Sequence, residues 1–369
     1  MTFMNEFDED VIHHQVHISR ETSASKAETL LSKSSWNLSD LPTLISPAMA
    51  NYIETLANQS HQLTVQRFGR TIQLFAPMYL SNECYNRCTY CGFSLDHKYP
   101  RKTLTETEIQ TEYAILKKKG FQHILLLTGE APGTVGPDYI GRAIELATNT
   151  FDSVGIEVQP FTQSTYETLV KLGADNVSLY QETYHQETYQ NHHLSGRKRH
   201  YHNRLRAVEA AGAAGFYKLS VGALLGLYDW RFEALSLAQH IQYLQSRFWN
   251  IQFSVSFPRI KDMYGEYTIH HPISDSEFVQ LLCSFRLLFP DLGITLSTRE
   301  SSTFRDNLIP LGITTLSAES KTNPGGYSGT NSESQFDTSD TRSITQIAES
   351  IQSAGYDALY KDWIRNLTQ

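Results

Sequence analysis

Short apolar runs alternate with longer amphipathic stretches along most of this chain, from residue 71 onward. The short runs have the length of buried strands, whereas the longer stretches carry apolar residues at the three- and four-residue spacing of a helix face. The predicted strands are 72–79, 122–128, 153–159, 175–181, 217–223, 251–257, 293–298 and 313–318. Helical patterns between them include 106–119, 139–149, 201–214, 230–248 and 275–289.

This alternation predicts an α/β fold. Strands that alternate with helices pair in parallel through right-handed crossovers. About eight such units predict a (β/α)8 barrel over residues 71–330. A doubly wound open sheet remains the alternative, because the period of a pattern does not report whether a sheet closes. In a barrel, the polar residues that follow one strand after another would share the C-terminal face, where chemistry gathers.

Two further segments flank the predicted barrel. Residues 1–70 are predicted to form a helical N-terminal extension that packs against the barrel and could close one end of it, and Ser46 followed by Pro47 starts one of its helices. Residues 331–369 are predicted to form a C-terminal loop and helix. The Ser-, Thr- and Asn-rich start of this segment has the composition of a mobile loop, and 344–354 has a helical pattern.

Composition and charge narrow the class of protein. The net charge is −8 and the isoelectric point is near 6.0, and no basic stripe with interleaved aromatics is present, so a nucleic-acid partner is not expected. The first ten residues are acidic and lack the apolar core of a signal peptide. No apolar run reaches membrane-spanning length. We therefore expect a cytoplasmic protein with no membrane partner.

Three of the four cysteines lie in one loop after the first predicted strand. Cys84, Cys88 and Cys91 have C-x3-C-x2-C spacing, close enough to bind one metal centre. A structural zinc site or an ordinary cubane takes four protein ligands, so three thiolates leave one metal position open. The alternatives are a zinc site completed by His97, a disulfide or unrelated thiols. Cys283 sits in an apolar helical pattern and is predicted to be a core residue.

The cysteine spacing, with aromatics beside the last cysteine, resembles the radical S-adenosylmethionine (SAM) superfamily. That resemblance implies one [4Fe–4S] cluster whose open iron binds the amino and carboxylate groups of SAM. Leu127-Thr128-Gly129-Glu130 is similar to the superfamily's small-residue-plus-glutamate motif after the second strand.

Further segments narrow the resemblance to one family. Together they resemble the 2-iminoacetate synthases, the tyrosine lyases of bacterial thiamine biosynthesis. The segments are Val158-Gln159-Pro160, 180–185 (YQETYH), 254–259 (SVSFPR), 296–300 (LSTRE) and 323–327 (NPGGY). The resemblance implies cleavage of L-tyrosine to 2-iminoacetate and 4-methylphenol, with SAM converted to methionine and 5′-deoxyadenosine. It also implies two protein partners, a thiazole synthase that receives the imine and an external electron donor such as flavodoxin or ferredoxin.

The same resemblance assigns residues to roles. Cys84, Cys88 and Cys91 would bind the cluster. The SAM-binding residues would be Glu130 for the ammonium, Glu182 for the ribose hydroxyls or the ammonium, and Arg197 for the carboxylate. Arg259 and Arg299 both follow predicted strands, and a guanidinium can bind the tyrosine carboxylate through two hydrogen bonds. The sequence does not rank these two arginines, and either of them can instead be a structural ion-pair partner.

Three alternative functions remain at this stage. A lyase of another aromatic amino acid would share the cysteine loop. A tyrosine lyase of the hydrogenase-maturation type carries a second cluster on a cysteine-bearing C-terminal extension, and no cysteine follows Cys283 here. A non-catalytic iron–sulfur protein for electron transfer or scaffolding would be expected to supply a fourth ligand and would not need carboxylates and arginines at the strand ends.

Overall fold

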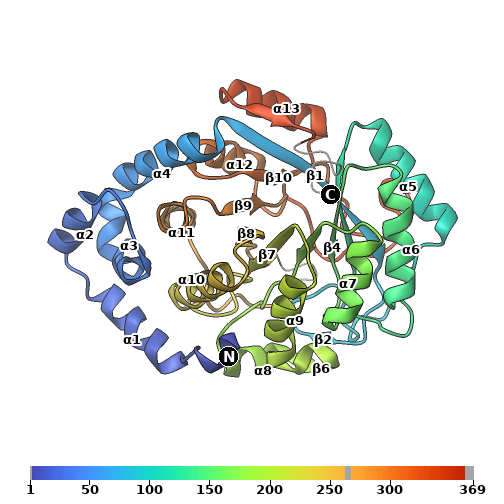
Figure 1. Cartoon of the computed structure of the whole chain (residues 1–369), viewed down its shortest axis with the longest axis horizontal. Coiled ribbons are helices and arrows are strands. Elements are labelled where there is room, and N and C mark those ends of the chain that lie inside the picture. The colour runs from blue at the N-terminus through green and yellow to red at the C-terminus, as the bar shows by residue number, and fades with distance from the viewer. Residues whose placement is uncertain (1, 262–266, 362–369) are drawn as a thin grey trace.

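The computed structural model describes residues 2–261 and 267–361, and its centre is a closed barrel of eight parallel strands (Figure 1). In barrel order the strands are β1 (Thr71–Ser81), β3 (His123–Thr128), β4 (Ser153–Glu157), β5 (Asn176–Ser178), β7 (Lys218–Gly222), β8 (Gln252–Ser256), β9 (Gly293–Leu296) and β10 (Thr315–Ser317). Every predicted strand is therefore confirmed. The pairing of Gln73 in β1 with Thr315 in β10 closes the sheet and excludes the open alternative.

Helices surround this barrel on the outside. They are α5 (Glu106–Lys118), α6 (Pro137–Thr148), α7 (Gln163–Lys171), α8 (Gln186–His192), α9 (Tyr201–Ala213), α10 (Trp230–Arg247), α11 (Asp275–Leu288) and α12 (Ser302–Leu308). Reciprocal caps start some of them, as at Thr105 with Glu108 and at Ser274 with Glu277. Each such cap contributes about 1 kcal/mol. None of the helices within 2–261 and 267–361 has the length and apolarity that crossing a membrane requires.

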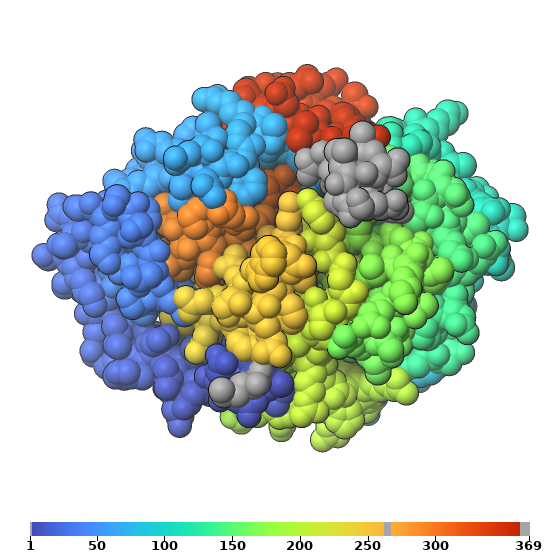
Figure 2. Space-filling model, in the orientation of Figure 1, coloured from blue at the N-terminus to red at the C-terminus, as the bar shows by residue number. Residues whose placement is uncertain are grey.

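The N-terminal extension packs along the side of the barrel. Its helices are α1 (Glu9–Arg20), α2 (Ala24–Leu31), α3 (Leu41–Leu44) and α4 (Ile53–Phe68). Helix α1 packs against α10 and α4 packs against α11, so the extension forms a second helical layer over one flank of the molecule (Figure 2). The expectation that it closes one end of the barrel was wrong. The N-terminal extension covers apolar faces of α10 and α11, which would otherwise be exposed to water.

The C-terminal segment is held more tightly than its composition indicates. The Gly92 amide donates to the carbonyl of Gln335 at 3.1 Å, and the side chain of Asn82 donates to the carbonyl of Glu333 at 3.3 Å. The predicted mobile loop is thus bound to the loop that carries the cysteines. Helix α13 (Ile344–Ser353) is confirmed, and the short strand β11 (Asp357–Leu359), which was not predicted, pairs with the start of β1. The end of the predicted segment, from residue 362, lies outside the described residues.

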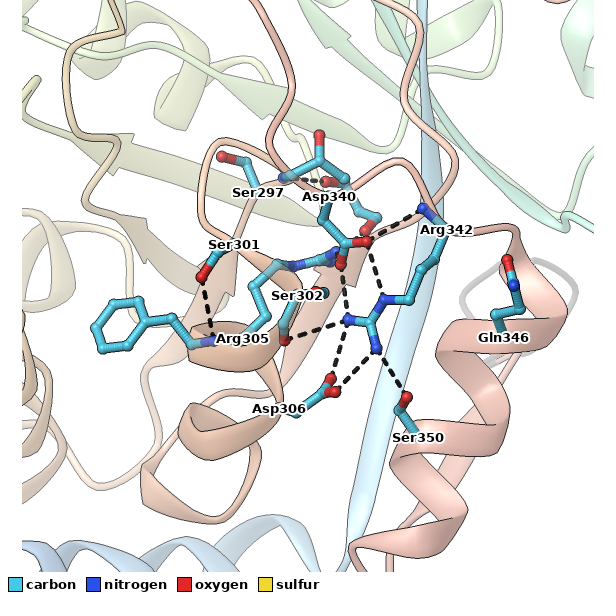
Figure 3. Close-up of polar contacts among 12 residues, drawn as sticks. Ser297, Ser301, Ser302, Arg305, Asp306, Asp340, Arg342, Gln346 and Ser350 are labelled. Carbon is cyan, nitrogen blue, oxygen red and sulfur yellow. Dashed lines mark hydrogen bonds and ion pairs between the residues drawn. The ribbon is translucent and has the colours of Figure 1, made fainter.

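A buried ion-pair network anchors the same segment to α12 (Figure 3). The carboxylate of Asp340 binds both Arg305 and Arg342, and Arg342 also binds Asp306. Arg305 and Asp340 are fully buried. The Asp340 amide also donates to the carbonyl of Thr298, so the network fixes the chain beside the C-terminal end of β9.

Candidate active site

A cavity with about 1010 Å³ of empty space, part of it open to solvent, lies at the C-terminal end of the barrel. Residues in or directly after all eight barrel strands line it, including Tyr79, Leu127, Glu157, Glu182, Leu224, Ser256, Arg299 and Ser317. The polar residues that follow successive strands in the sequence are therefore brought together, as the barrel prediction requires.

The cysteine loop lies at the edge of this cavity. Cys84 and Cys88 are buried, and Cys91 lines the cavity. The loop is held by a short antiparallel pairing of β2 (Arg87–Cys88) with β6 (His193–Ser195). Gly129 approaches it so closely that a Cβ there would collide with the carbonyl of Glu83, which explains why a glycine precedes Glu130.

The three thiols fit a cluster with one open iron. Burial raises the pKa of Cys84, and the charge of Cys91 raises it further. Burial is also the largest cause of the raised pKa of Cys88, to which Cys91 and Cys84 add. The fourth cysteine, Cys283, is buried in α11 within the main core and is not part of this group. Three thiolate donors beside an open cavity are what a cluster with an exchangeable fourth ligand requires.

Glu130 is placed behind the cysteine loop with both of its oxygens bound. One oxygen accepts from the Arg204 guanidinium, and the other accepts from the side-chain amide of Asn86 at 2.9 Å. The same Asn86 amide lies 3.7 Å from the sulfur of Cys84. Glu130 therefore orients the loop through Asn86, and its predicted contact with SAM would come in addition to these two bonds.

Glu182 lies directly on the cavity, in an ion pair with Lys198. The Lys198 ammonium lies 2.7 Å from the Glu182 carboxylate. Burial would raise the pKa of Glu182, but the charges of Lys198 and Arg204 outweigh it and hold this pKa below its usual value. The backbone of Glu182 is in the left-handed region, at φ +72°, which costs a non-glycine residue about 1 kcal/mol. The surrounding turn must therefore hold this residue in place.

Glu157 and Arg299 also belong to the charged lining of the cavity. Burial and the nearby charge of Glu182 raise the pKa of Glu157 to about 7, so this carboxyl can gain or lose a proton near neutral pH. The Arg299 guanidinium stacks on the ring of Phe336, with 3.4 Å from its central carbon to the ring centroid. Both side chains line the cavity.

Two of the predicted arginines lie elsewhere. Arg259 forms ion pairs with Glu300 and Asp275 and does not line the cavity. Arg197 is exposed and lines a separate surface pocket, whereas its neighbour Lys198 reaches the cavity. The predicted role of Arg197 in binding SAM stays a prediction, and its position gives that role no support.

Sequence reasoning missed four residues of the site. Asn86 lies inside the cysteine motif, and Glu157 ends a predicted strand, so both were visible as candidates. Lys198 lies in a short basic run, 197–199, and of these three residues it alone lines the cavity. Gln335 gave no signal at all: it comes from the C-terminal loop, bonds to the Tyr79 hydroxyl at 2.7 Å and lies 3.8 Å from the sulfur of Cys91.

A closed parallel barrel that carries a three-cysteine loop beside a charged cavity defines a radical SAM enzyme. The sequence pattern of the radical SAM superfamily matches residues 78–236, and that of the biotin and thiamin synthesis associated domain matches residues 256–357. Among solved structures, HydG, described as a maturase of the [FeFe]-hydrogenase, superposes with a TM-score of 0.90 at 29% identity, over 95% of this chain and 80% of that one.

Curated relatives identify the family within this class. The 2-iminoacetate synthases of Salmonella typhimurium and Escherichia coli are each 43% identical to this chain over 343 residues, which cover 92% of this chain and 91% of each relative. The chain belongs to the 2-iminoacetate synthase family.

Proposed function

We propose that this chain is a 2-iminoacetate synthase, a carbon–carbon lyase that cleaves the Cα–Cβ bond of L-tyrosine to 2-iminoacetate and 4-methylphenol. The observation that carries the proposal is that a three-thiol loop, the Glu182–Lys198 pair and Arg299 meet at one barrel cavity, in a chain 43% identical to 2-iminoacetate synthases over 92% of its length. The product would supply the thiazole part of thiamine.

The cavity offers residues that would bind the [4Fe–4S] cluster and SAM. When bound, the [4Fe–4S] cluster and SAM supply a 5′-deoxyadenosyl radical that takes a hydrogen atom from tyrosine. Cys84, Cys88 and Cys91 would hold the cluster, and Glu182 with Lys198 would meet the polar groups of SAM. Glu130 would act mainly through Asn86, although a carboxylate can accept about four hydrogen bonds and so retains capacity for the SAM ammonium.

The remaining cavity residues suit a zwitterionic amino acid. Arg299 would bind the tyrosine carboxylate, and Glu157, which lines the same cavity, would accept a proton or face the ammonium. Tyr79 and Tyr90 keep neutral phenols, because burial raises the pKa of each well above its ordinary value. The barrel and loops around the cavity would limit the access of water that would otherwise quench a radical.

The test is anaerobic reconstitution with iron and sulfide, followed by dithionite, SAM and each aromatic amino acid in turn. Tyrosine should give 5′-deoxyadenosine and 4-methylphenol in equal amounts. The Cys88→Ser variant should lose both products, whereas Cys283→Ala, which alters a thiol in the core of α11, should keep them. Nucleoside without 4-methylphenol would retain the enzyme class and overturn the substrate. Neither product from wild type, despite a full cluster, would favour an electron-transfer role.

We further propose a thiazole synthase as the protein that receives the product, because a free imine hydrolyses in water. The two proteins should co-purify from cells, and no association at high concentration with substrates present would contradict the proposal. A flavodoxin or ferredoxin would supply the electron. A cytoplasmic setting suits the four free thiols.

A further inference from the structure

Gln335 contacts the cysteine loop, although it comes from the other end of the chain. Its side chain lines the barrel cavity, and the amide nitrogen Nε2 donates to the sulfur of Cys91 at 3.8 Å. The amide oxygen Oε1 accepts from the hydroxyl of Tyr79, another residue of the cavity, at 2.7 Å. One side chain of the C-terminal loop therefore touches both a cluster ligand and the cavity wall.

We propose that Gln335 is a positioning residue for the [4Fe–4S] cluster, and that its hydrogen bond to Cys91 raises the reduction potential of the bound cluster. Reduction adds one electron, and part of the added negative charge falls on the ligating sulfurs. A donor that faces a thiolate therefore stabilises the reduced form more than the oxidised form. The inference rests on the cluster of the proposed function and not on its amino-acid substrate.

The Tyr79 hydroxyl determines which end of the Gln335 amide faces the sulfur. Tyr79 is buried and packs edge-on against the buried ring of Phe93, with the ring centroids 5.7 Å apart. Its hydroxyl donates to Oε1, which leaves Nε2 directed at Cys91. The reversed amide would place oxygen lone pairs against a thiolate. Only the observed orientation gives an attractive contact at both ends of the amide.

The alternative explanation is that Gln335 only anchors the C-terminal loop. Its backbone already does so, because its N–H donates to the carbonyl of Thr322 at 2.9 Å and its carbonyl accepts from the Gly92 N–H at 3.1 Å. A Cβ at Gly92 would collide with that carbonyl, so the two loops lie directly against each other. Since the backbone makes these contacts, the side chain is available for Cys91.

A second amide acts on the cluster ligands in the same sense. The side-chain nitrogen of Asn86 lies 3.7 Å from the sulfur of Cys84 and also donates to the carboxylate of Glu130. Two of the three sulfurs thus have a side-chain amide within reach, one from inside the cysteine motif and one from the C-terminal loop. Hydrogen bonds to the sulfurs and partners behind the ligands are what tune a cluster in proteins.

The test measures the midpoint potential of the reconstituted cluster by electron paramagnetic resonance, without SAM or amino acid. Gln335→Leu removes the donor and should lower the ratio of reduced to oxidised cluster about tenfold at a fixed potential, a shift of about 59 mV for one electron. Gln335→Glu keeps an acceptor for Tyr79 but places an oxygen at Cys91, so it should lower the potential further. Gln352, exposed on α13, takes the same two substitutions as the matched control and should keep the wild-type potential.

Two further measurements separate tuning from a loss of structure. Iron and sulfide analysis should show equal cluster content in all variants, because the three cysteines are unchanged. Wild type labelled with nitrogen-15 only at glutamine side chains should show a nitrogen coupling to the reduced cluster in pulsed spectra, and Gln335→Leu should lack it. Equal potentials in wild type and Gln335→Leu, a fall only in Gln335→Glu, or no coupling in wild type would overturn the inference. A wild type that binds no cluster would instead contradict the proposed function.

Discussion

Arg299 and Arg259 differ in what their guanidinium groups contact, although both follow a barrel strand. Arg259 is bound by Glu300 and Asp275, so its charge is already neutralised within the protein. Arg299 faces the cavity and rests on the ring of Phe336, and no carboxylate among the described residues forms a salt bridge with it. A guanidinium held on an aromatic ring and directed into a cavity is suited to a carboxylate ligand.

Replacing Arg299 with glutamine should raise the KM for tyrosine roughly 10- to 150-fold, because a charge-assisted hydrogen bond contributes about 1.5–3 kcal/mol. Arg259→Gln serves as the control and should leave KM within about twofold while lowering the thermal midpoint. Steady-state kinetics with saturating SAM measures both variants. A larger KM change in Arg259→Gln than in Arg299→Gln would reverse the assignment.

The site could be predicted from the sequence as far as strand ends, but not as far as side-chain direction. Apolar runs show where strands stop, which located Glu182 and Arg299 correctly at the cavity. Whether a side chain points into the cavity or away from it changes with a shift of one residue along the chain, and the sequence does not show that register. Arg197 and Lys198 illustrate this, because the turn after β6 sends only Lys198 inward. The long-range contact of Gln335 with Cys91 depends on tertiary packing alone.

The turn after β5 is an element whose shape depends on one buried acid from α10. The Glu233 carboxylate accepts from the Tyr184 amide at 2.9 Å and bonds to the hydroxyl of Thr183. Those two residues follow Glu182, whose left-handed backbone they help to hold. Burial raises the pKa of Glu233 to about 8, even though both hydrogen bonds act to lower it.

This raised pKa gives the stability of the turn a definite pH dependence. An unfolded glutamate titrates near 4.5, and the folded one near 8, so the stabilising contribution is complete below pH 4.5 and is lost as pH rises to 8. Relative to Glu233→Gln, the free energy of unfolding of wild type should fall between pH 5 and 8 by up to roughly 1.4 kcal/mol per pH unit. Urea unfolding at four pH values measures this. Parallel curves would contradict the raised pKa.

The network in Figure 3 predicts unequal effects for two acids that bind the same arginine. Asp340→Asn should lower the free energy of unfolding by about 3–5 kcal/mol, because it leaves the buried Arg305 unpaired. Asp306→Asn removes a partner whose side chain is 38% exposed and should cost less than about 1 kcal/mol. Both variants weaken Arg342, so the difference isolates Arg305. Equal losses in denaturant titrations would argue against this division.

Element prediction succeeded where elements were long and periodic and failed where pairing was non-local. The eight barrel strands and the helices between them carry their own hydrophobic pattern. The three-residue strand β11 has no such pattern, and it forms by pairing in parallel with the start of β1. The loop before α13 has the composition of a flexible segment, but Gln335 and Asp340 fix it through partners more than 30 residues away.

In the molecule as a whole, two cysteines of the loop pack in a different cluster of buried residues from the main barrel core. The main core runs from Phe3 to Tyr356 without the loop cysteines, whereas Cys84 and Cys91 pack in a small separate group. Removing the cluster with a chelator should therefore leave the far-ultraviolet circular dichroism and cooperative unfolding intact while abolishing SAM binding. Loss of the dichroism signal together with the cluster would show that the loop supports the fold.

Strand β1 contacts three partners, β3, β10 and β11, and the last two lie more than 230 residues later in the chain. On a ribosome that adds about 5–20 residues per second, the edge of β1 that faces β10 would wait roughly 12–50 s for its partner to be synthesised. During that interval an unpaired strand edge is open to association with other nascent chains. The seam between the first and last barrel strands is therefore where chaperones would have most to protect.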